Sequence, residues 1–130
     1  MSIVSDEDVA ARRLFSRAGG GRVIATVYVP VAVSEDEWSC MFDILGLPDP
    51  VRSEGRGVDS LQALTVAIGG MRLLLSRSGE SLTWDEQESG DYGIPRYIPR
   101  GFGLEIEAHL VAAVEKELAL LVAARSREPE

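Results

Sequence analysis

The chain has 130 residues, the length of one ordinary domain with a buried core, and its 45% hydrophobic content excludes a disordered chain. The net charge of -8, from 21 acidic and 13 basic residues, argues against a nucleic-acid-binding surface. It favours a basic protein partner, although an acidic surface also serves solubility alone.

We expect residues 1–130 to form a single domain with frayed ends over about 1–8 and 125–130. The only cysteine, Cys40, has no partner for an internal disulfide, and one histidine cannot complete a Cys/His zinc set. The opening residues MSIVSDEDVAARR lack the apolar core of a secretory signal. No apolar run approaches the roughly 18 residues that span a membrane, so we expect a cytoplasmic protein without a membrane partner.

The first half of the chain predicts three strands. The first runs from about Ala11 to Ala18, and the glycines Gly19–Gly21 then permit a tight reversal. The second, from Arg22 to Val33, is rich in β-branched residues, and Pro30 marks its end or an edge. The third, from Trp38 to Leu47, alternates so that one face carries Trp38, Cys40, Phe42 and Ile44.

An exposed loop is expected from Pro48 to Gly57, because prolines, glycines and charges dominate it. A helix follows, with Asp59 as its N-cap, Gln62 as the second member of a capping box and Gly79 as its stop. Helical spacing predicts a buried stripe on this helix, made of Leu61, Leu64, Ile68, Met71 and Leu75.

The second half predicts a short strand from Ser81 to Trp84, an irregular stretch from Asp85 to Arg100 and a helix from Gly103 to about Ala124. The inward face of that helix is expected to carry Ile106, Leu110, Val114, Leu118 and Leu121. The predicted fold is α+β, a small antiparallel sheet of three to four strands packed on one face by two α-helices.

No combination of residues matches a catalytic set. His109 lies in a predicted helix beside glutamates, where a surface position is the simpler interpretation than a general base. Cys40 lies in an apolar strand and is expected to be buried and inert rather than nucleophilic. We therefore expect a protein that is not an enzyme and that holds no cofactor and no metal.

The acidic segment from Glu80 to Asp91 is the main candidate binding surface. Its spacing does not match a calcium-binding loop, so the alternatives are a solvated loop or a docking surface for a basic partner. Its aromatic residues are either partner anchors or caps of the core. Arg96 and Arg100 either form an anion pocket or bridge to the acidic loop. The candidate partner-binding residues are Trp84, Asp85, Glu86, Glu88, Asp91, Tyr92, Arg96 and Tyr97.

The string GVDSLQAL, from Gly57 to Leu64, resembles the attachment site of acyl carrier proteins. That resemblance implies phosphopantetheine on Ser60. The family consists of smaller helical bundles, whereas strand-like segments precede this motif. A capping box explains Asp59, Leu61 and Gln62 without a cofactor, so modification of Ser60 is the alternative function.

A longer resemblance covers about Ala11 to Arg96. A strand pair, a Trp-x-Cys strand, the GVDSLQAL helix, Leu-Thr-Trp and Gly-Ile-Pro-Arg together look like a family of short bacterial proteins of unknown function. Size, charge and the lack of a catalytic set are also similar to those of immunity proteins, which neutralise bacterial toxins. The leading hypothesis is a non-catalytic protein-binding module, an inhibitor that occludes a basic partner such as a toxin. Pairing of two copies into a homodimer stays open.

Overall fold

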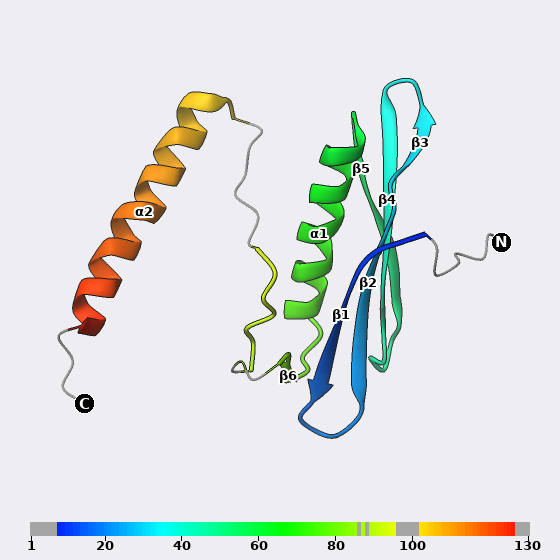
Figure 1. Cartoon of the computed structure of the whole chain (residues 1–130), viewed down its shortest axis with the longest axis horizontal. Helices are drawn as coiled ribbons and strands as arrows, with labels where there is room; N and C mark the ends of the chain where they lie inside the picture. Colours follow the sequence, from blue (N-terminus) through cyan, green and yellow to red (C-terminus); the bar gives the residue numbers. More distant parts are fainter. Residues whose placement is uncertain (1–7, 86, 88, 96–101, 127–130) are drawn as a thin grey trace. The chain divides into compact units, whose positions relative to one another are not determined.

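The computed structural model describes residues 8–85, 87, 89–95 and 102–126 of the chain (Figure 1). It divides into two compact units, Met1–Arg96 and Tyr97–Glu130, and each is described by itself. The ends predicted to fray lie largely outside the described residues. That residues 1–130 form a single domain stays a prediction.

The first unit contains one antiparallel sheet, which has six strands among the described residues (Figure 1). The hydrogen-bonded order is β3-β4-β2-β1-β6, and β5 pairs with the other side of β4. The strands are β1 (Val9–Arg17), β2 (Arg22–Tyr28), β3 (Val31–Ser34), β4 (Glu37–Leu45), β5 (Val51–Gly57) and β6 (Leu82–Thr83). The α+β class is confirmed, but the predicted count of three to four strands is too small.

The extra strands have two separate causes. Pro30 interrupts the predicted Arg22 to Val33 strand, so that β2 and β3 pair in succession with the same side of β4. The pair Val27 and Phe42 is followed by the pair Val31 and Ser39, so β2–β3 holds one residue more than β4 here. This is a β-bulge. The prediction that Pro30 ends a strand is confirmed.

The predicted loop from Pro48 to Gly57 is wrong from Val51 onward. Residues Val51–Gly57 form β5, which pairs with β4 from Val51 opposite Ile44 to Gly57 opposite Trp38. Glycines and charges disfavour a strand in isolation. Here the long partner strand on one side and a helix over one face outweigh that local preference.

Helix α1 (Ser60–Ser76) begins at the predicted cap. The Asp59 Oδ1 atom accepts a hydrogen bond from the Gln62 amide at 2.8 Å, and Gln62 Oε1 accepts one from the Val58 amide at 2.7 Å. The first bond satisfies one of the donors that a helix N-terminus leaves open, and the second ties the residue before the cap to the first turn. The helix ends at Ser76, with Arg77 as its C-cap, so Gly79 with φ +76 lies just beyond it.

The buried face of α1 is narrower than the sequence predicts. Its buried residues are Ala63, Ala67, Met71 and Leu75, whereas Leu61 is 70% exposed. Leu64 and Ile68 are partly buried beside the core. The predicted stripe is therefore wrong at Leu61, because alanines rather than leucines point directly at the sheet.

Two glycines of β5 explain this rotation. A Cβ atom on Gly55 would lie 2.3 Å from the backbone nitrogen of Ala67, and one on Gly57 would lie 2.6 Å from that of Ala63. Both distances are shorter than any normal contact, so the helix backbone packs directly on the backbone of β5. The side chains that face these glycines must be small, and Ala63 and Ala67 are fully buried there.

The second unit contains one helix among its described residues, α2 (Leu104–Ser126). It begins one residue after the predicted Gly103 and ends two residues after the predicted Ala124. Taken by itself, α2 has no buried residue. The packing of a second helix on the sheet stays a prediction. No helix within the described part of the chain is both long enough and apolar enough to cross a membrane.

Replacing Gly55 by alanine tests the backbone contact between α1 and β5. The added methyl group meets rigid backbone atoms of Ala67 and Ala63, so we expect a loss of about 3 kcal/mol in unfolding free energy. Gly19→Ala is the matched control, since nothing lies within 4 Å of its Cβ position, and it should change stability by less than about 1 kcal/mol. Urea denaturation measures both, and equal midpoints for the two variants would contradict the packing described.

Candidate functional site

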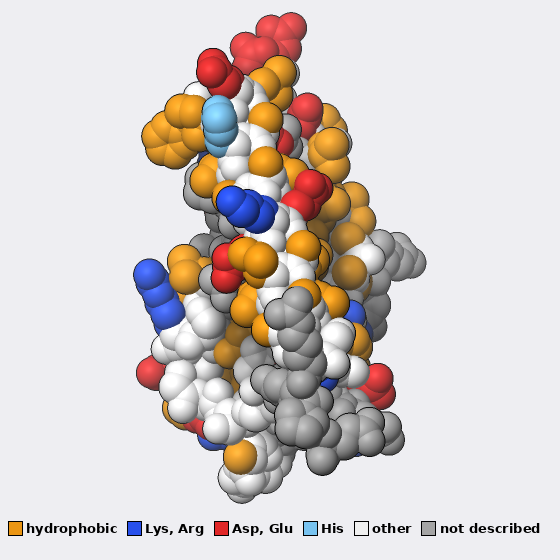
Figure 2. All heavy atoms as spheres, turned by 90° about the vertical axis from the view of Figure 1, so that its left-hand side faces the viewer, with side chains coloured by type: hydrophobic (Ala, Val, Ile, Leu, Met, Phe, Trp, Pro, Cys, Tyr) orange, Lys and Arg blue, Asp and Glu red, His pale blue; other side chains and the backbone are white. Residues whose placement is uncertain are grey.

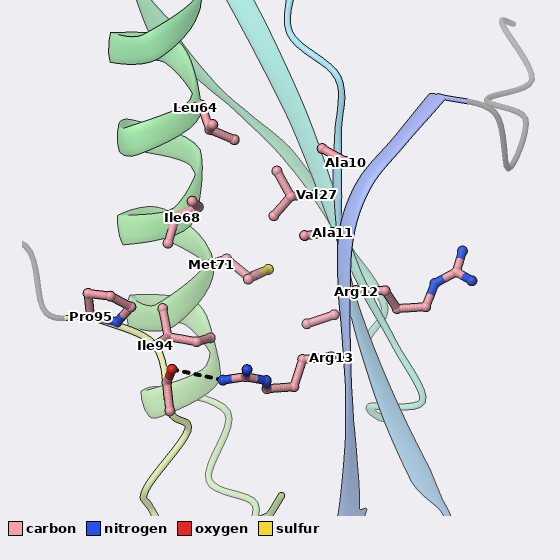
Figure 3. Close-up of a pocket in the computed structure, with 12 residues that line it drawn as sticks. Ala10, Ala11, Arg12, Arg13, Val27, Leu64, Ile68, Met71, Ile94 and Pro95 are labelled. Atoms are coloured by element: carbon pink, nitrogen blue, oxygen red, sulfur yellow. Dashed lines mark hydrogen bonds between the residues drawn. The ribbon is translucent and has the colours of Figure 1, made fainter.

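An apolar groove lies between β1 and α1 on the helix-covered face of the sheet (Figure 3). It has a volume of about 300 Å³. Figure 3 shows Leu64, Ile68 and Met71 on the α1 side and Ala11 on the β1 side. Because α1 packs against β4 and β5, it leaves the β1 side of the face uncovered within the first unit. The groove is therefore a concave, mostly apolar surface that can accommodate a ligand.

One end of the groove is closed by the segment that follows β6. Arg13 on β1 donates hydrogen bonds from Nη1 to the carbonyl oxygens of Tyr92 and Gly93, at 3.0 and 2.8 Å. Arg72 on α1 donates from Nε to the carbonyl of Ile94 at 3.2 Å. Two arginines from different elements therefore hold three successive residues of an irregular segment in place.

The guanidinium group of Arg13 also stacks on an aromatic ring. Its central carbon lies 3.8 Å from the centroid of the Trp84 ring, which is cation–π geometry. Gly93 has φ +65, and a Cβ there would lie 2.2 Å from the Trp84 ring. Only glycine fits between the ring and the groove, so Arg13, Trp84 and Gly93 form one packed unit.

The candidate residues of the acidic segment differ in what they present to solvent. Trp84 is partly buried under Arg13, and Tyr92 is 9% exposed with its ring edge-on to Phe15 at 6.0 Å. Asp85 and Asp91 are exposed, and Asp91 Oδ1 accepts a hydrogen bond from the Gly93 amide at 3.0 Å. Both aromatic residues thus pack with the core, while both acids face solvent.

The remaining predicted site residues Glu86, Glu88, Arg96 and Tyr97 lie outside the described residues. The partner-binding role of all eight candidate residues stays a prediction. Sequence reasoning did not select Arg13. The strand pattern nevertheless indicates a special role for it. Ala11, Arg13 and Phe15 occupy every second position of β1 and share one face, and an arginine on a core-facing side requires polar partners.

The opposite face of the sheet carries a polar network centred on Asp43, which is only 2% exposed. Its Oδ2 atom accepts hydrogen bonds from the Tyr28 hydroxyl at 2.5 Å and from Arg52 at 3.3 Å. Burial, and next the hydrogen bond to Asp43, raises the pKa of Tyr28. Asp43 Oδ1 is buried without a hydrogen-bond partner in the described structure. The network ties β2, β4 and β5 together across the sheet.

A second polar cluster on this face connects β4 and β5. Ser39 donates a short hydrogen bond to Glu54, and Arg56 bridges Glu54 at 2.9 Å and Glu37 at 2.7 Å. The hydrogen bond from Ser39, and next that from Arg56, lowers the pKa of Glu54. These charges compensate one another within the sheet, unlike the apolar lining of the groove.

The other singled-out residues do not assemble a reactive site. Cys40 is fully buried, donates its thiol to the Tyr28 carbonyl at 3.2 Å, and has a pKa raised by burial. The predicted inert thiol fits this environment. His109 is exposed on α2, and Ser60 is exposed as the first residue of α1. Within the described ranges no three His, Cys, Asp or Glu side chains are grouped to hold a metal ion.

These features define a class of protein, an α+β domain with one helix packed by glycine contacts on an antiparallel sheet and with an apolar groove beside it. The chain belongs to the family described as a domain of unknown function, DUF6968, whose model matches residues 10–96. No curated protein and no solved structure matches the chain. The expected membership in an uncharacterised family is confirmed, and bacterial origin and the likeness to immunity proteins stay predictions.

The arginine clamp is tested by Arg13→Lys. Lysine keeps the charge but loses the planar stacking on Trp84 and the directed bonds to Tyr92 and Gly93, so we expect a loss of about 2 kcal/mol. Amide hydrogen exchange over residues 89–95 should accelerate. Arg77→Lys, at an exposed cap, is the control and should leave that exchange unchanged. Equal protection in both variants would contradict the clamp.

Proposed function

We propose that this chain is a non-catalytic protein-binding module that receives an extended segment of a partner protein in the groove between β1 and α1. The carrying observation is an apolar groove of about 300 Å³ beside a strand edge that is largely unpaired among the described residues. An extended segment fits this combination, because its side chains alternate between a groove and solvent while its backbone pairs with a strand.

The groove favours apolar side chains. Leu64, Ile68 and Met71 supply one wall from successive turns of α1, and Val27 lies at its floor on β2. On β1 the lining residues include the small Ala10 and Ala11, which leave the volume open beside Arg13. Covering these groups with an apolar side chain stabilises a complex by roughly 25 cal/mol for each Å² removed from water.

The edge of β1 supplies backbone partners. β6 pairs with β1 only at Ser16 and Arg17, so no described strand covers that edge from Val9 to Phe15. The Arg17 amide donates toward β2, to Gly21, whereas the Ala18 amide donates to Ser81 on the other side. By alternation the backbone groups of Leu14 face the outer edge. A partner strand can therefore hydrogen-bond there without disturbing the pairing with β2.

Charge supports a basic partner. The chain carries a net charge of -8, and the exposed Asp85 and Asp91 lie in the segment that reaches the groove at Gly93. A basic protein is attracted to such a surface and associates faster at low salt. In its most specific form the proposal is an inhibitor, of the kind represented by immunity proteins, that occludes a basic active site such as that of a toxin.

Filling the groove tests its role. We expect Ala11→Trp to occupy the space between β1 and α1 and to abolish capture of the partner from an extract of the source organism. Leu45→Trp is the matched control, because it adds the same ring on the opposite face of the sheet, at an exposed position of β4 away from the β1 edge. Circular dichroism establishes that both variants are folded.

The proposal requires a protein that wild type and Leu45→Trp retain in equal amount and that Ala11→Trp loses. A protein retained equally by all three binds elsewhere on the chain and contradicts the groove as the site. If wild type retains no protein but does retain a small apolar molecule that Ala11→Trp loses, the groove binds a small ligand and the protein-binding proposal is wrong.

Neutralising the acids tests the charge of the partner. The double variant Asp85→Asn/Asp91→Asn removes two negative charges. Asparagine tolerates the φ of +53 at residue 85, and an asparagine at residue 91 can still accept the hydrogen bond from the Gly93 amide. We expect association with the captured partner to slow several-fold at low salt, with less change in dissociation. Asp36→Asn/Asp49→Asn removes the same charge from exposed turns beside β4 and is the control. Equal association rates for both double variants would contradict a basic partner that approaches this end of the groove.

A further inference from the structure

The outer side of β5 is a long strand edge without a described partner. β5 pairs with β4 over all of its 7 residues, from Val51 to Gly57, without a register shift. No strand among the described residues pairs with its other side. An unpaired edge can accept another strand, and a sheet often blocks such an edge with a proline or a bulge. β5 contains neither.

The backbone groups on this edge follow from the alternation of the sheet. The Arg17 amide donates to Gly21, so odd residues of β1 and β2 bond each other and even residues of β2 bond β4. β4 then bonds β5 through its own even residues, whose partners on β5 are odd. The amides and carbonyls that face outward on β5 are therefore those of Arg52, Glu54 and Arg56.

The flank of α1 above this edge is apolar and exposed. Ile68 lines the groove and follows the buried Ala67, whereas Val66 precedes Ala67, so Val66 lies on the opposite flank of the helix. Leu73 follows on the same flank about two turns further along. Val66 is 39% exposed and Leu73 is 45% exposed. Because the groove is on the β1 side of α1, this apolar flank is on the side of the β5 edge.

Exposed apolar side chains also run along α2, where Figure 2 shows them among charged ones. Consecutive residues such as Leu120, Leu121 and Val122 are all more than half exposed and point to different sides of that helix. They therefore define no single contact surface. The β5 edge and the flank of α1 differ in this respect, since both lie on one side of the first unit.

We propose that β5 pairs antiparallel with β5 of a second copy of this chain, so that the sheets of the two copies join. A twofold axis perpendicular to the sheet, beside Ser53, makes the two strands antiparallel and keeps both α1 helices on one face. The flanks that carry Val66 and Leu73 then face each other across the axis. A second copy thus covers the strand edge and the apolar flank in one operation, and it leaves both grooves free on the β1 side.

The path of α1 leaves room for this junction. The helix packs on β5 at Gly57 and Gly55, but by Gly70 it lies over the Phe42 ring of β4. Phe42 pairs with Ser53, so the helix has crossed toward β4 at the level of the axis. An axis beside Gly55 would instead bring the two helices together where each still lies over β5.

The charges favour the same register. With the axis beside Ser53, Glu54 lies opposite Arg52 of the second copy, and the symmetry repeats this pair. An axis beside Glu54 would set Glu54 against Glu54 and Arg52 against Arg56, and like charges directly opposite are destabilising. The pairing within each copy persists, because the bond to Asp43 uses one donor of Arg52 and a guanidinium has five.

A cysteine at the axis tests the register in the full-length chain. Sedimentation equilibrium should give wild type a mass twice the 14.1 kDa of one chain, falling to one chain on dilution. Residue 53 faces itself in a non-hydrogen-bonded pair, where Cα atoms are about 4.5 Å apart. Ser53→Cys should therefore form a disulfide between two copies on mild oxidation, which non-reducing electrophoresis detects. Wild type should not, since its Cys40 is buried.

Glu54→Cys is the matched control, because it is exposed one residue along the same strand. In this register its Cα lies roughly 8 Å from that of the same residue in the second copy, too far for a disulfide. A wild-type chain that keeps the mass of one copy at all concentrations would overturn the proposal. A dimer in which Ser53→Cys does not crosslink, or in which both cysteines crosslink equally, would also overturn it.

A proline on the edge tests the strand pairing itself. Glu54→Pro removes an amide that faces outward and leaves the bonds between β5 and β4, so we expect the dimer Kd to rise by about tenfold or more. Glu54→Ala removes the same side chain but keeps the amide, and it should raise the Kd less. Circular dichroism establishes that both variants are folded. Equal Kd values for the two variants would contradict pairing through this edge.

Discussion

The backbone of α1 rests directly on the backbone of β5, and the rest of the first unit depends on this contact. Gly55 and Gly57 leave no side chain between the two elements, and Ala63 and Ala67 fill the remaining space. Contact at this distance fixes both the rotation of the helix and its lateral position. The helix is thereby drawn over β4 and β5, and the β1 side of the same face is left as a groove.

The two faces of the sheet have different physical characters as a result. On the helix face, small residues on β1 and apolar residues on α1 leave an open groove whose end is held by Arg13 and Arg72. On the other face, Asp43 and its partners satisfy most of their charges within the sheet. A surface that is apolar, concave and bounded by well-packed elements suits a partner, which is why we propose binding at the groove.

Patterns of local origin were predictable from the sequence, and features that depend on distant partners were not. The cap at Asp59, the break at Pro30 and the inward face of β4 follow from neighbouring residues. Strand β5 was not predicted, because glycines favour a loop by themselves. Their role is apparent only from the close packing of α1 on Gly55 and Gly57. The clamp of Arg13 joins residues about eighty positions apart, and its only local sign is an arginine on a core-facing strand position. Of the candidate site, Trp84, Tyr92 and Asp91 were named, but the groove beside them was not.

The most direct test of this account is the accessibility of the groove in the folded, full-length chain. An Ala11→Cys variant is labelled with a bulky maleimide, with buried Cys40 as the internal protected thiol and Leu14→Cys on the opposite face as the exposed reference. The account predicts that Cys at position 11 reacts about as fast as the reference and becomes protected when the captured partner is added. Protection as strong as that of Cys40 in the free chain would show that the chain covers its own groove, and would contradict the account.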